Sequence, residues 1–299
     1  MKLEVVRLAT RSSPLALFQS HAVGKRLVES GLVSSYELLC VSTEGDIRTD
    51  VAIAEMARRG VFTAEVELAV LDGRADVAVH SAKDLPSSNI PTELVLASVP
   101  MRADARDALV GAKLSELKAG ATIATGSARR RVQLAALVPG VCFVELRGNI
   151  ATRLTKVPPD GAAVFAFAAL ERLDLVEHAS EVLDIASLLP QVGQGAIALR
   201  CRADDGRLRE VLTGIDDPIA HRALLAERAY LARLGGGCEA PVGAYAEVDL
   251  DTFGITLEAM LASEDGSRIL RRRSSGDDPA ELGRSLAEQL SAAFAPDVA

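Results

Sequence analysis

The sequence predicts an α/β protein that ends in a small α+β domain, and three observations support this. Short apolar runs alternate with amphipathic segments along most of the chain, which is typical of strands and helices in mainly parallel sheets. The 299 residues correspond to roughly two domains at about 150 residues each. Hydrophobic residues make up 49% and charged residues 25%, which is the composition of a globular protein and not of a disordered one.

The first third of the chain contains clear signals for the start and end of its elements. Pro14 suits the first position of a helix, and Gly31 suits its end. Thr63 is expected to cap a second helix. Pro86 biases the residue before it away from the helical conformation, so the polar stretch 81–84 is expected in a loop. The expected elements are strands over 5–10 and 77–80 and helices over 14–30 and 63–72.

The middle of the chain repeats this unit of strand, loop and helix, whereas the end of the chain departs from it. The glycine-rich stretch 192–195 leads into an apolar strand, and a long helix from Pro218 ends at three glycines. The expected elements are strands over 122–125, 141–146, 196–200, 254–262 and 267–273, and helices over 128–137, 150–156, 218–234 and from 279 onward. The predicted domains are a first lobe of 1–99 plus 195–214, a second lobe of 100–194 and a small α+β domain of 217–299.

Charge and composition exclude several kinds of partner. The 33 basic and 41 acidic residues give a net charge of −8, and aromatics are 3% with no Trp, so a nucleic-acid-binding surface is not expected. The Arg triplets 129–131 and 271–273 are too short to change this, and Arg271 is expected on a solvated strand face. The Cys and His residues lack the spacing of metal ligands. No signal peptide or membrane span is recognised, so we expect a cytoplasmic protein.

Three loops share a design that suits an anionic ligand. Each follows a predicted strand, contains Arg and hydroxyl or amide side chains, and leads into a helix; the loops begin at Arg11, Thr125 and Arg147. Unpaired N–H groups at a helix start attract anions, and Arg matches the geometry of carboxylate or phosphate. For any single loop, the simpler explanation is an ordinary helix cap beside a solvated Arg. The three together favour a ligand that carries several negative charges.

Two further residues suit chemistry. Asp84 follows Lys83 at a predicted strand end, where a carboxylate can accept a ligand N–H or move a proton; the alternative is a surface ion pair. Cys238 follows three glycines, and a thiol on such a loop can serve as a nucleophile or an attachment point. The alternative, a small buried hydrophobic residue, suits the other three cysteines better, namely Cys40, Cys142 and Cys201.

Six motifs together resemble the porphobilinogen deaminases, also called hydroxymethylbilane synthases. They occur in the family's order, and the resemblance runs from Arg7 to Ala246, which is most of the chain. The motifs are ATRSSPLALFQ (9–19), VAVHSAKDLP (77–86), RDALV (106–110), RGNIATRL (147–154), LPQVGQGA (189–196) and ERAYLARLGGGCEAPVGAYA (227–246).

The resemblance implies an enzyme, a fold and a set of site residues. The reaction is a transferase reaction: four porphobilinogen molecules condense head to tail, with loss of ammonia, into linear hydroxymethylbilane. The fold has two lobes like those of periplasmic binding proteins, which flank a cleft, and a third domain with a cysteine loop. The cofactor is dipyrromethane, held covalently by Cys238, and Asp84 is the catalytic residue. The cofactor contacts are Ser13, Lys83, Asp84, Thr125, Ser127, Arg129 and Arg130; the substrate contacts are Arg11, Arg147, Arg153 and Arg172; the hinge residue is Gln194.

The resemblance also implies a monomer whose product passes to uroporphyrinogen-III synthase. The chain departs from the family pattern at four positions, and these departures bear on affinity and loop movement. Gly126 replaces a usual Ser, Gly235 a usual acidic residue, Ala64 a frequent Lys and Ala169 a usual Gly. The alternative function is that of a two-lobed solute-binding protein, since a cleft between two lobes also serves proteins that are not enzymes.

Overall fold

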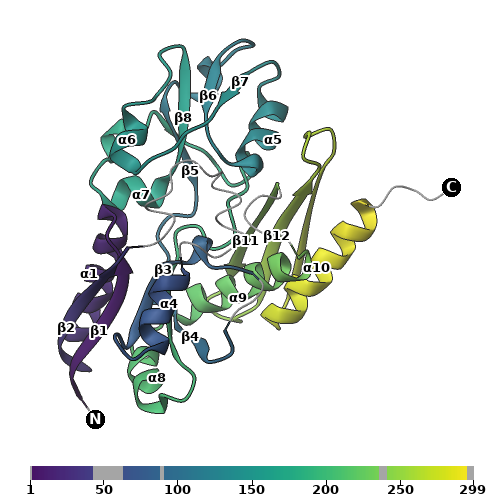
Figure 1. The fold of residues 1–299 in the computed structure, drawn as a ribbon. Coiled ribbons are helices and arrows are strands. Elements are labelled where there is room, and N and C mark those ends of the chain that lie inside the picture. The colour runs from purple at the N-terminus through teal and green to yellow at the C-terminus, as the bar shows by residue number, and fades with distance from the viewer. Residues whose placement is uncertain (1, 43–62, 88–90, 236–240, 295–299) are drawn as a thin grey trace. The chain divides into compact units, whose positions relative to one another are not determined.

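A computed structural model describes residues 2–42, 63–87, 91–235 and 241–294 (Figure 1). The chain forms two compact units. The first consists of Met1–Ala103 with Ala196–Arg222, and the second of Asp104–Gly195 with Ala223–Ala299. Within the described ranges, no helix combines the length and the apolar character that a bilayer crossing requires.

The first unit contains a five-stranded sheet in the order β2-β1-β3-β10-β4. The first three of these strands are mutually parallel, β10 is antiparallel to both of its neighbours, and β4 therefore shares the direction of the parallel set. The strands are β1 Leu3–Arg11, β2 Val33–Val41, β3 Val77–Ser81, β4 Leu94–Ser98 and β10 Ile197–Arg202, and the helices are α1 Pro14–Glu29, α4 Ala64–Leu71 and α8 Gly206–Thr213.

Helices cover both faces of this sheet because successive side chains of a strand point to opposite faces. Leu8 of β1 belongs to the apolar cluster that contains Val23 and Leu27 of α1 and the buried leucines of α8. The next residue, Ala9, belongs to a second cluster, formed with Val66 and its neighbours on α4. Because apolar clusters hold the sheet from both faces, the positions of the carboxyl ends of its strands are fixed.

The second unit contains a sheet of the same design, in the order β7-β6-β8-β5-β9. Here β7, β6 and β8 are parallel, and β5 is antiparallel to both β8 and β9. One face packs against α5 through Leu134, and the other packs against α7 through Leu170. The strands are β5 Asp107–Gly111, β6 Thr122–Ala124, β7 Cys142–Val144, β8 Gly161–Ala166 and β9 Glu181–Val182, and the helices are α5 Ala128–Leu137, α6 Ile150–Leu154 and α7 Phe167–Arg172.

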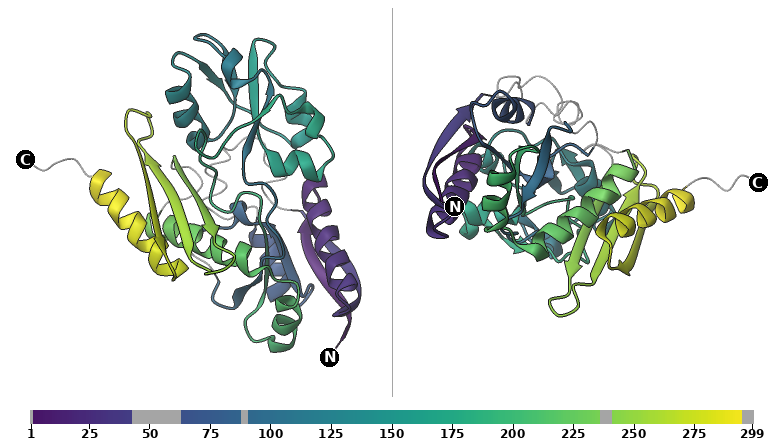
Figure 2. Two further views of the ribbon diagram at one scale, coloured as in Figure 1. Left: turned by 180° about the vertical axis from the view of Figure 1, so that it is seen from behind. Right: turned by 90° about the horizontal axis from the view of Figure 1, so that it is seen from below.

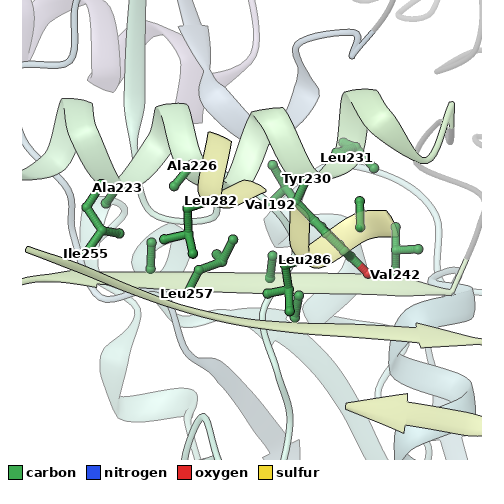
Figure 3. Packing of buried hydrophobic residues seen from close by; sticks show 14 of the residues in the cluster. Val192, Ala223, Ala226, Tyr230, Leu231, Val242, Ile255, Leu257, Leu282 and Leu286 are labelled. Carbon is green, nitrogen blue, oxygen red and sulfur yellow. The ribbon is translucent and has the colours of Figure 1, made fainter. Parts of the chain in front are cut away.

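The C-terminal part is a three-stranded antiparallel sheet with two helices on one face (Figure 2). Tyr230, Leu257 and Leu286 form the centre of its core, which Figure 3 shows. The Tyr230 hydroxyl donates a hydrogen bond to the Met260 carbonyl oxygen at 2.8 Å, so the buried O–H is satisfied. The elements are β11 Val242–Val248, β12 Ile255–Ala262, β13 Ile269–Gly276, α9 Pro218–Arg233 and α10 Pro279–Phe294.

The predicted fold class is confirmed. Each of the two five-stranded sheets has helices on both faces, and four of its five strands share one direction. A small α+β part forms the C-terminal end of the chain. The three-domain division with the limits given above stays a prediction.

Several elements differ from expectation. The C-terminal sheet has a third strand, β11, and residues 82–84 form a single 3-10 turn instead of an irregular loop. Thr63 precedes α4, but its side chain makes no capping hydrogen bond.

Arg271 was expected on a solvated face, and this expectation is wrong. Its Nη atoms donate to the carbonyl oxygens of Ile185 (2.7 Å) and Ala186 (2.6 Å), and its Nε donates to the Glu258 carboxylate. The side chain therefore ties β13 to the segment that follows β9. The alternation pattern of a strand shows which face a residue occupies but not whether another segment covers that face.

Candidate active site

The predicted site residues of the first unit lie at the carboxyl edge of one sheet. Arg11 is the last residue of β1, and β3, the parallel neighbour of β1, ends at Ser81. Ser13 caps α1 by accepting a hydrogen bond from the Ala16 N–H at 3.3 Å. Lys83 and Asp84 belong to the turn that follows β3. Neighbouring parallel strands thus bring together residues that are about 70 positions apart, as the carboxyl-end rule for α/β sheets predicts.

The turn that carries Asp84 is hydrogen-bonded to a neighbouring segment at its first residue and is closed by a bond within itself. The Ala82 N–H donates to the Ala196 carbonyl oxygen at 3.0 Å, and the Leu85 N–H donates to the Ala82 carbonyl oxygen at 3.3 Å. Ala82 and Leu85 are both buried, whereas Asp84 is exposed. The Ser81 hydroxyl adds a bond to the Gln19 side chain on α1 at 2.9 Å. The anchored turn therefore presents an accessible carboxylate.

In the second unit, the hydroxyls of Thr125 and Ser127 follow the end of β6. The buried Thr125 Oγ1 accepts from the Ser127 N–H at 3.2 Å, and Ser127 Oγ accepts from the Arg130 N–H at 3.4 Å, so Ser127 is the N-cap of α5. Both side chains act as acceptors in these contacts. Their O–H groups remain suitable donors to an anion.

Arg129 and Arg130, the second and third residues of α5, both bind one buried carboxylate. Arg129 Nη2 donates to Asp107 Oδ2 at 2.7 Å, and Arg130 Nη2 donates to Asp107 Oδ1 at 2.7 Å. Burial raises the pKa of Asp107, but the charges and hydrogen bonds of the two guanidinium groups outweigh burial and hold this pKa well below its usual range. Burial lowers the pKa of Arg129, and the Asp107 charge opposes that effect. Both arginines are almost fully buried, at 3% and 9% exposure.

Gln194, the predicted hinge residue, joins the same cluster. Its Nε2 donates to Asp107 Oδ1 at 2.8 Å and to the Ala105 carbonyl oxygen at 2.7 Å. The segment 189–195 is thereby attached to the start of β5. Whether Gln194 acts as a hinge stays a prediction.

The remaining predicted arginines lie after β7 and at the end of α7. Arg147 Nε is 3.9 Å from Glu145 Oε2, and Arg131 Nη2 donates to Glu145 Oε1 at 2.6 Å. Arg153 Nε donates to the Gly148 carbonyl oxygen at 2.7 Å. Gly148 directly precedes Asn149, which is the N-cap of α6. Arg172 Nη2 donates to the Gly195 carbonyl oxygen at 2.7 Å. Burial lowers the pKa of Arg172 to about 10, which leaves it charged at neutral pH.

One of the four cysteines lies outside the described residues, and the other three differ in exposure. Cys238 lies outside the described residues, so its role stays a prediction. Cys201 is buried as expected, but Cys40 and Cys142 are exposed, because each lies on an edge strand of its sheet. Among the described residues, no group of three or more His, Cys, Asp or Glu side chains lies close enough to bind a metal ion.

Sequence reasoning did not single out Asp107 or Glu145. Asp107 is part of the RDALV motif, and a signal was available: an acidic residue that opens an apolar strand is expensive to bury unless it is paired. Glu145 adjoins Arg147 in sequence, but it follows an exposed edge strand, and nothing in its neighbourhood marks it.

The donors of the second unit fit a ligand with several carboxylates. In the part of the chain that the structure describes, the buried Nε atoms of Arg129 and Arg130 have no hydrogen-bond partner. Two buried cations with one carboxylate also leave a surplus of positive charge. A dipyrromethane, whose two pyrroles each bear an acetate and a propionate, would offer acceptors and negative charge of the kind that these donors fit.

These features define an α/β protein of two units, each of which gathers cationic side chains at one sheet edge. The family model "porphobilinogen deaminase, dipyromethane cofactor binding domain" matches residues 6–210, and the model of the porphobilinogen deaminase C-terminal domain matches residues 221–292. The chain belongs to the porphobilinogen deaminase family.

Curated relatives agree over nearly the whole chain. The porphobilinogen deaminase of Acidothermus cellulolyticus is 45% identical over 96% of this chain and 89% of its own length. That of Roseiflexus castenholzii is 44% identical over 95% of this chain and 94% of its own. Among solved structures, the arginine-specific periplasmic binding protein STM4351 of Salmonella typhimurium has a TM-score of 0.38 at 10% identity, over 71% of this chain and 92% of that one.

The expectations on activity and cofactor are therefore confirmed. The protein is a transferase that condenses four porphobilinogen molecules into hydroxymethylbilane with loss of ammonia, and its cofactor is dipyrromethane. The alternative of a solute-binding protein is not supported by the family assignment.

Proposed function

We propose that Asp84 is the catalytic residue of this reaction. The observation that carries the proposal is the anchored turn, which holds an exposed carboxylate at the same sheet edge as Arg11 and Lys83. Ammonia leaves the substrate pyrrole with positive charge developing on the ring. Cations suit the substrate's carboxylates but oppose that charge, and the Asp84 carboxylate stabilises it and can accept the pyrrole N–H or move a proton.

We further propose that the cofactor is attached through a thioether to Cys238. When bound, the cofactor supplies the primer pyrroles on which the product grows. The proposed cofactor contacts are Ser13, Lys83, Asp84, Thr125, Ser127, Arg129 and Arg130, and the proposed substrate contacts are Arg11, Arg147, Arg153 and Arg172.

The distribution of charge supports these assignments. The chain carries a net charge of −8, yet seven of the eleven proposed contacts are cations. Only local concentration of positive charge allows an acidic protein to bind an anion of this kind. Each charge-assisted hydrogen bond contributes about 1.5–3 kcal/mol, so loss of one Arg is expected to weaken the site without abolishing it.

The variant Asp84→Asn tests the catalytic role. It keeps the size and one acceptor but loses the charge, so the rate of the chemical step should fall about 10²- to 10⁴-fold. Because the cationic contacts remain, bound pyrroles should accumulate as discrete increments in the intact mass. The control Asp72→Asn changes an exposed aspartate of the same unit, paired with Arg74 at 3.5 Å, and should retain its activity. Near-normal turnover of Asp84→Asn without trapped increments would refute the assignment.

The variant Cys238→Ala tests the attachment. The folded variant should have the mass of the bare chain, whereas the parent protein should carry an excess equal to two linked pyrroles. A covalent pyrrole pair in Cys238→Ala would show that another residue is the attachment point.

We also propose the predicted three-domain division, a monomeric state and a cytoplasmic location. The described cysteines are free thiols, which suits a reducing compartment. A single species near 31.4 kDa in light scattering supports the monomer, and a larger species contradicts it.

The linear product requires an enzyme that closes the ring, and we propose uroporphyrinogen-III synthase as that recipient; a coupled assay with both enzymes tests it.

A further inference from the structure

Asp107 connects three elements of the second unit through one carboxylate. Its backbone position is fixed in the sheet, because it pairs with Ala166 of β8 and its carbonyl oxygen accepts from the Leu183 N–H at 2.8 Å. The arginines reach it from α5, and Gln194 reaches it from the segment that precedes β10. The carboxylate has no exposed surface.

Each guanidinium is held at two of its nitrogens, in two different directions. Arg129 Nη1 donates to the Leu189 carbonyl oxygen while its Nη2 binds Asp107. Arg130 Nη1 donates to the Val164 carbonyl oxygen at 2.9 Å while its Nη2 binds Asp107. A planar guanidinium with two such contacts has little freedom to rotate. The orientation of its third nitrogen, Nε, is therefore fixed as well.

The charges in this cluster do not balance. Without Asp107, two adjacent guanidinium groups would lie buried with no counter-ion, which is strongly unfavourable. With Asp107, one positive charge is neutralised and one remains. The pair can thus stay buried and retain a net positive charge toward an anion.

We propose that Asp107 is a positioning residue for the cofactor: it holds Arg129 and Arg130 in the orientation in which they bind the cofactor's carboxylates. This inference rests on the proposed role of the two arginines. If Asp107 had a purely structural role, its loss would lower the stability of the fold without an additional effect on cofactor loading.

The experiment measures cofactor loading separately from stability. Apoprotein is produced in cells unable to make porphobilinogen, its Tm is measured by circular dichroism, and loading on addition of porphobilinogen is followed by intact mass well below that Tm. We expect Asp107→Asn to load at least about tenfold more slowly than the parent, because the amide offers one acceptor oxygen where two guanidinium groups need one each. The control Tyr230→Phe removes a buried hydrogen bond in the same unit, and it should lower the Tm without slowing loading.

A second pair of variants covers the case in which Asp107→Asn does not fold. Asp107→Asn/Arg130→Gln has the same net charge in the cluster as the parent, so it avoids two unneutralised cations. It is compared with Arg130→Gln alone, which differs from it only at Asp107. Slower loading of the double variant supports the positioning role, because Arg129 then lacks its carboxylate.

The outcomes separate this inference from the proposed function. If Asp107→Asn, or the double variant relative to Arg130→Gln, loads at an unchanged rate while folded, Asp107 has no positioning role. If Arg129→Gln and Arg130→Gln themselves load like the parent, the proposed role of the arginines fails, and the inference fails with it. Slow loading of the arginine variants together with normal loading of Asp107→Asn overturns the inference alone.

Discussion

Gly243 of β11 lies directly against the side chain of Arg129: a Cβ atom at position 243 would be 3.3 Å from Arg129 Cδ. The same Cβ would be 2.9 Å from the Pro190 carbonyl oxygen and 3.1 Å from that of Leu189. The Ala244 N–H donates to the Pro190 carbonyl oxygen at 3.1 Å, which holds the strand in this position. Gly243 is five residues beyond Cys238 in the sequence. The strand that follows the proposed attachment cysteine is therefore packed on an arginine proposed to bind the cofactor.

Gly243→Ala should impair both stability and cofactor loading. The added methyl must displace backbone oxygens and the Arg129 stem, and overpacking of this kind costs about 1–3 kcal/mol. Gly276→Ala is the matched control, because its Cβ would meet only Leu282 at 3.7 Å, an ordinary contact. Thermal unfolding and loading of the apoprotein check both effects. Equal behaviour of the two variants would show that β11 can shift freely at this point.

Glu145→Gln should lower the apparent KM for porphobilinogen. Glu145 is a carboxylate 3.9 Å from Arg147, a proposed substrate contact, and so it competes with the substrate's carboxylates. At Gly126, where the family usually has Ser, a Cβ would be 3.0 Å from Glu145 Oε2, so the glycine leaves room for this side chain. Interactions of exposed charges amount to about 0.2–1 kcal/mol, which corresponds to a KM lower by up to about fivefold with kcat unchanged. Glu177→Gln, an exposed glutamate of the same unit, is the control, and an unchanged or higher KM for Glu145→Gln would contradict the competition.

Arg271→Leu should destabilise the protein, whereas Arg273→Leu should not. Arg271 contacts Glu258 and two carbonyl oxygens, and loss of charge-assisted hydrogen bonds costs about 1.5–3 kcal/mol. Arg273 has a side chain that is 62% exposed and is paired with the equally exposed Glu247 at 3.4 Å, so its removal should change stability by less than about 0.5 kcal/mol. Urea unfolding of both variants measures the difference. A silent Arg271→Leu would mean that the segment at 185–186 is held by other contacts.

Thiol labelling should distinguish the apoprotein from the loaded protein. Burial raises the pKa of Cys201 to about 11, so this thiol should not react at mildly alkaline pH, whereas the exposed Cys40 and Cys142 should. Iodoacetamide should therefore add two groups to the loaded protein and three to the apoprotein, the third at Cys238. Three additions to the loaded protein would contradict a thioether at Cys238.

The sequence by itself determined the features that depend on a few neighbouring residues. The caps Ser13 and Ser127 and the order of the motifs at the strand ends were predictable, because a helix start or a turn is set by side chains within about four positions. The same motifs predicted the family, its reaction and its cofactor. They could not show which polar groups are buried together.

Only the tertiary structure decided how the cationic residues are paired. Asp107 lies 22 residues from Arg129 and 87 residues from Gln194, and it meets them because β5 is inserted beside β8 with α5 packed on the sheet. Arg271 was misplaced for the same reason, since the segment that covers it is 85 residues away. A sequence pattern shows that a side chain is charged and on which face of its element it lies. Burial and the choice of counter-ion depend on which distant segments the fold places against that face, and no local pattern encodes them.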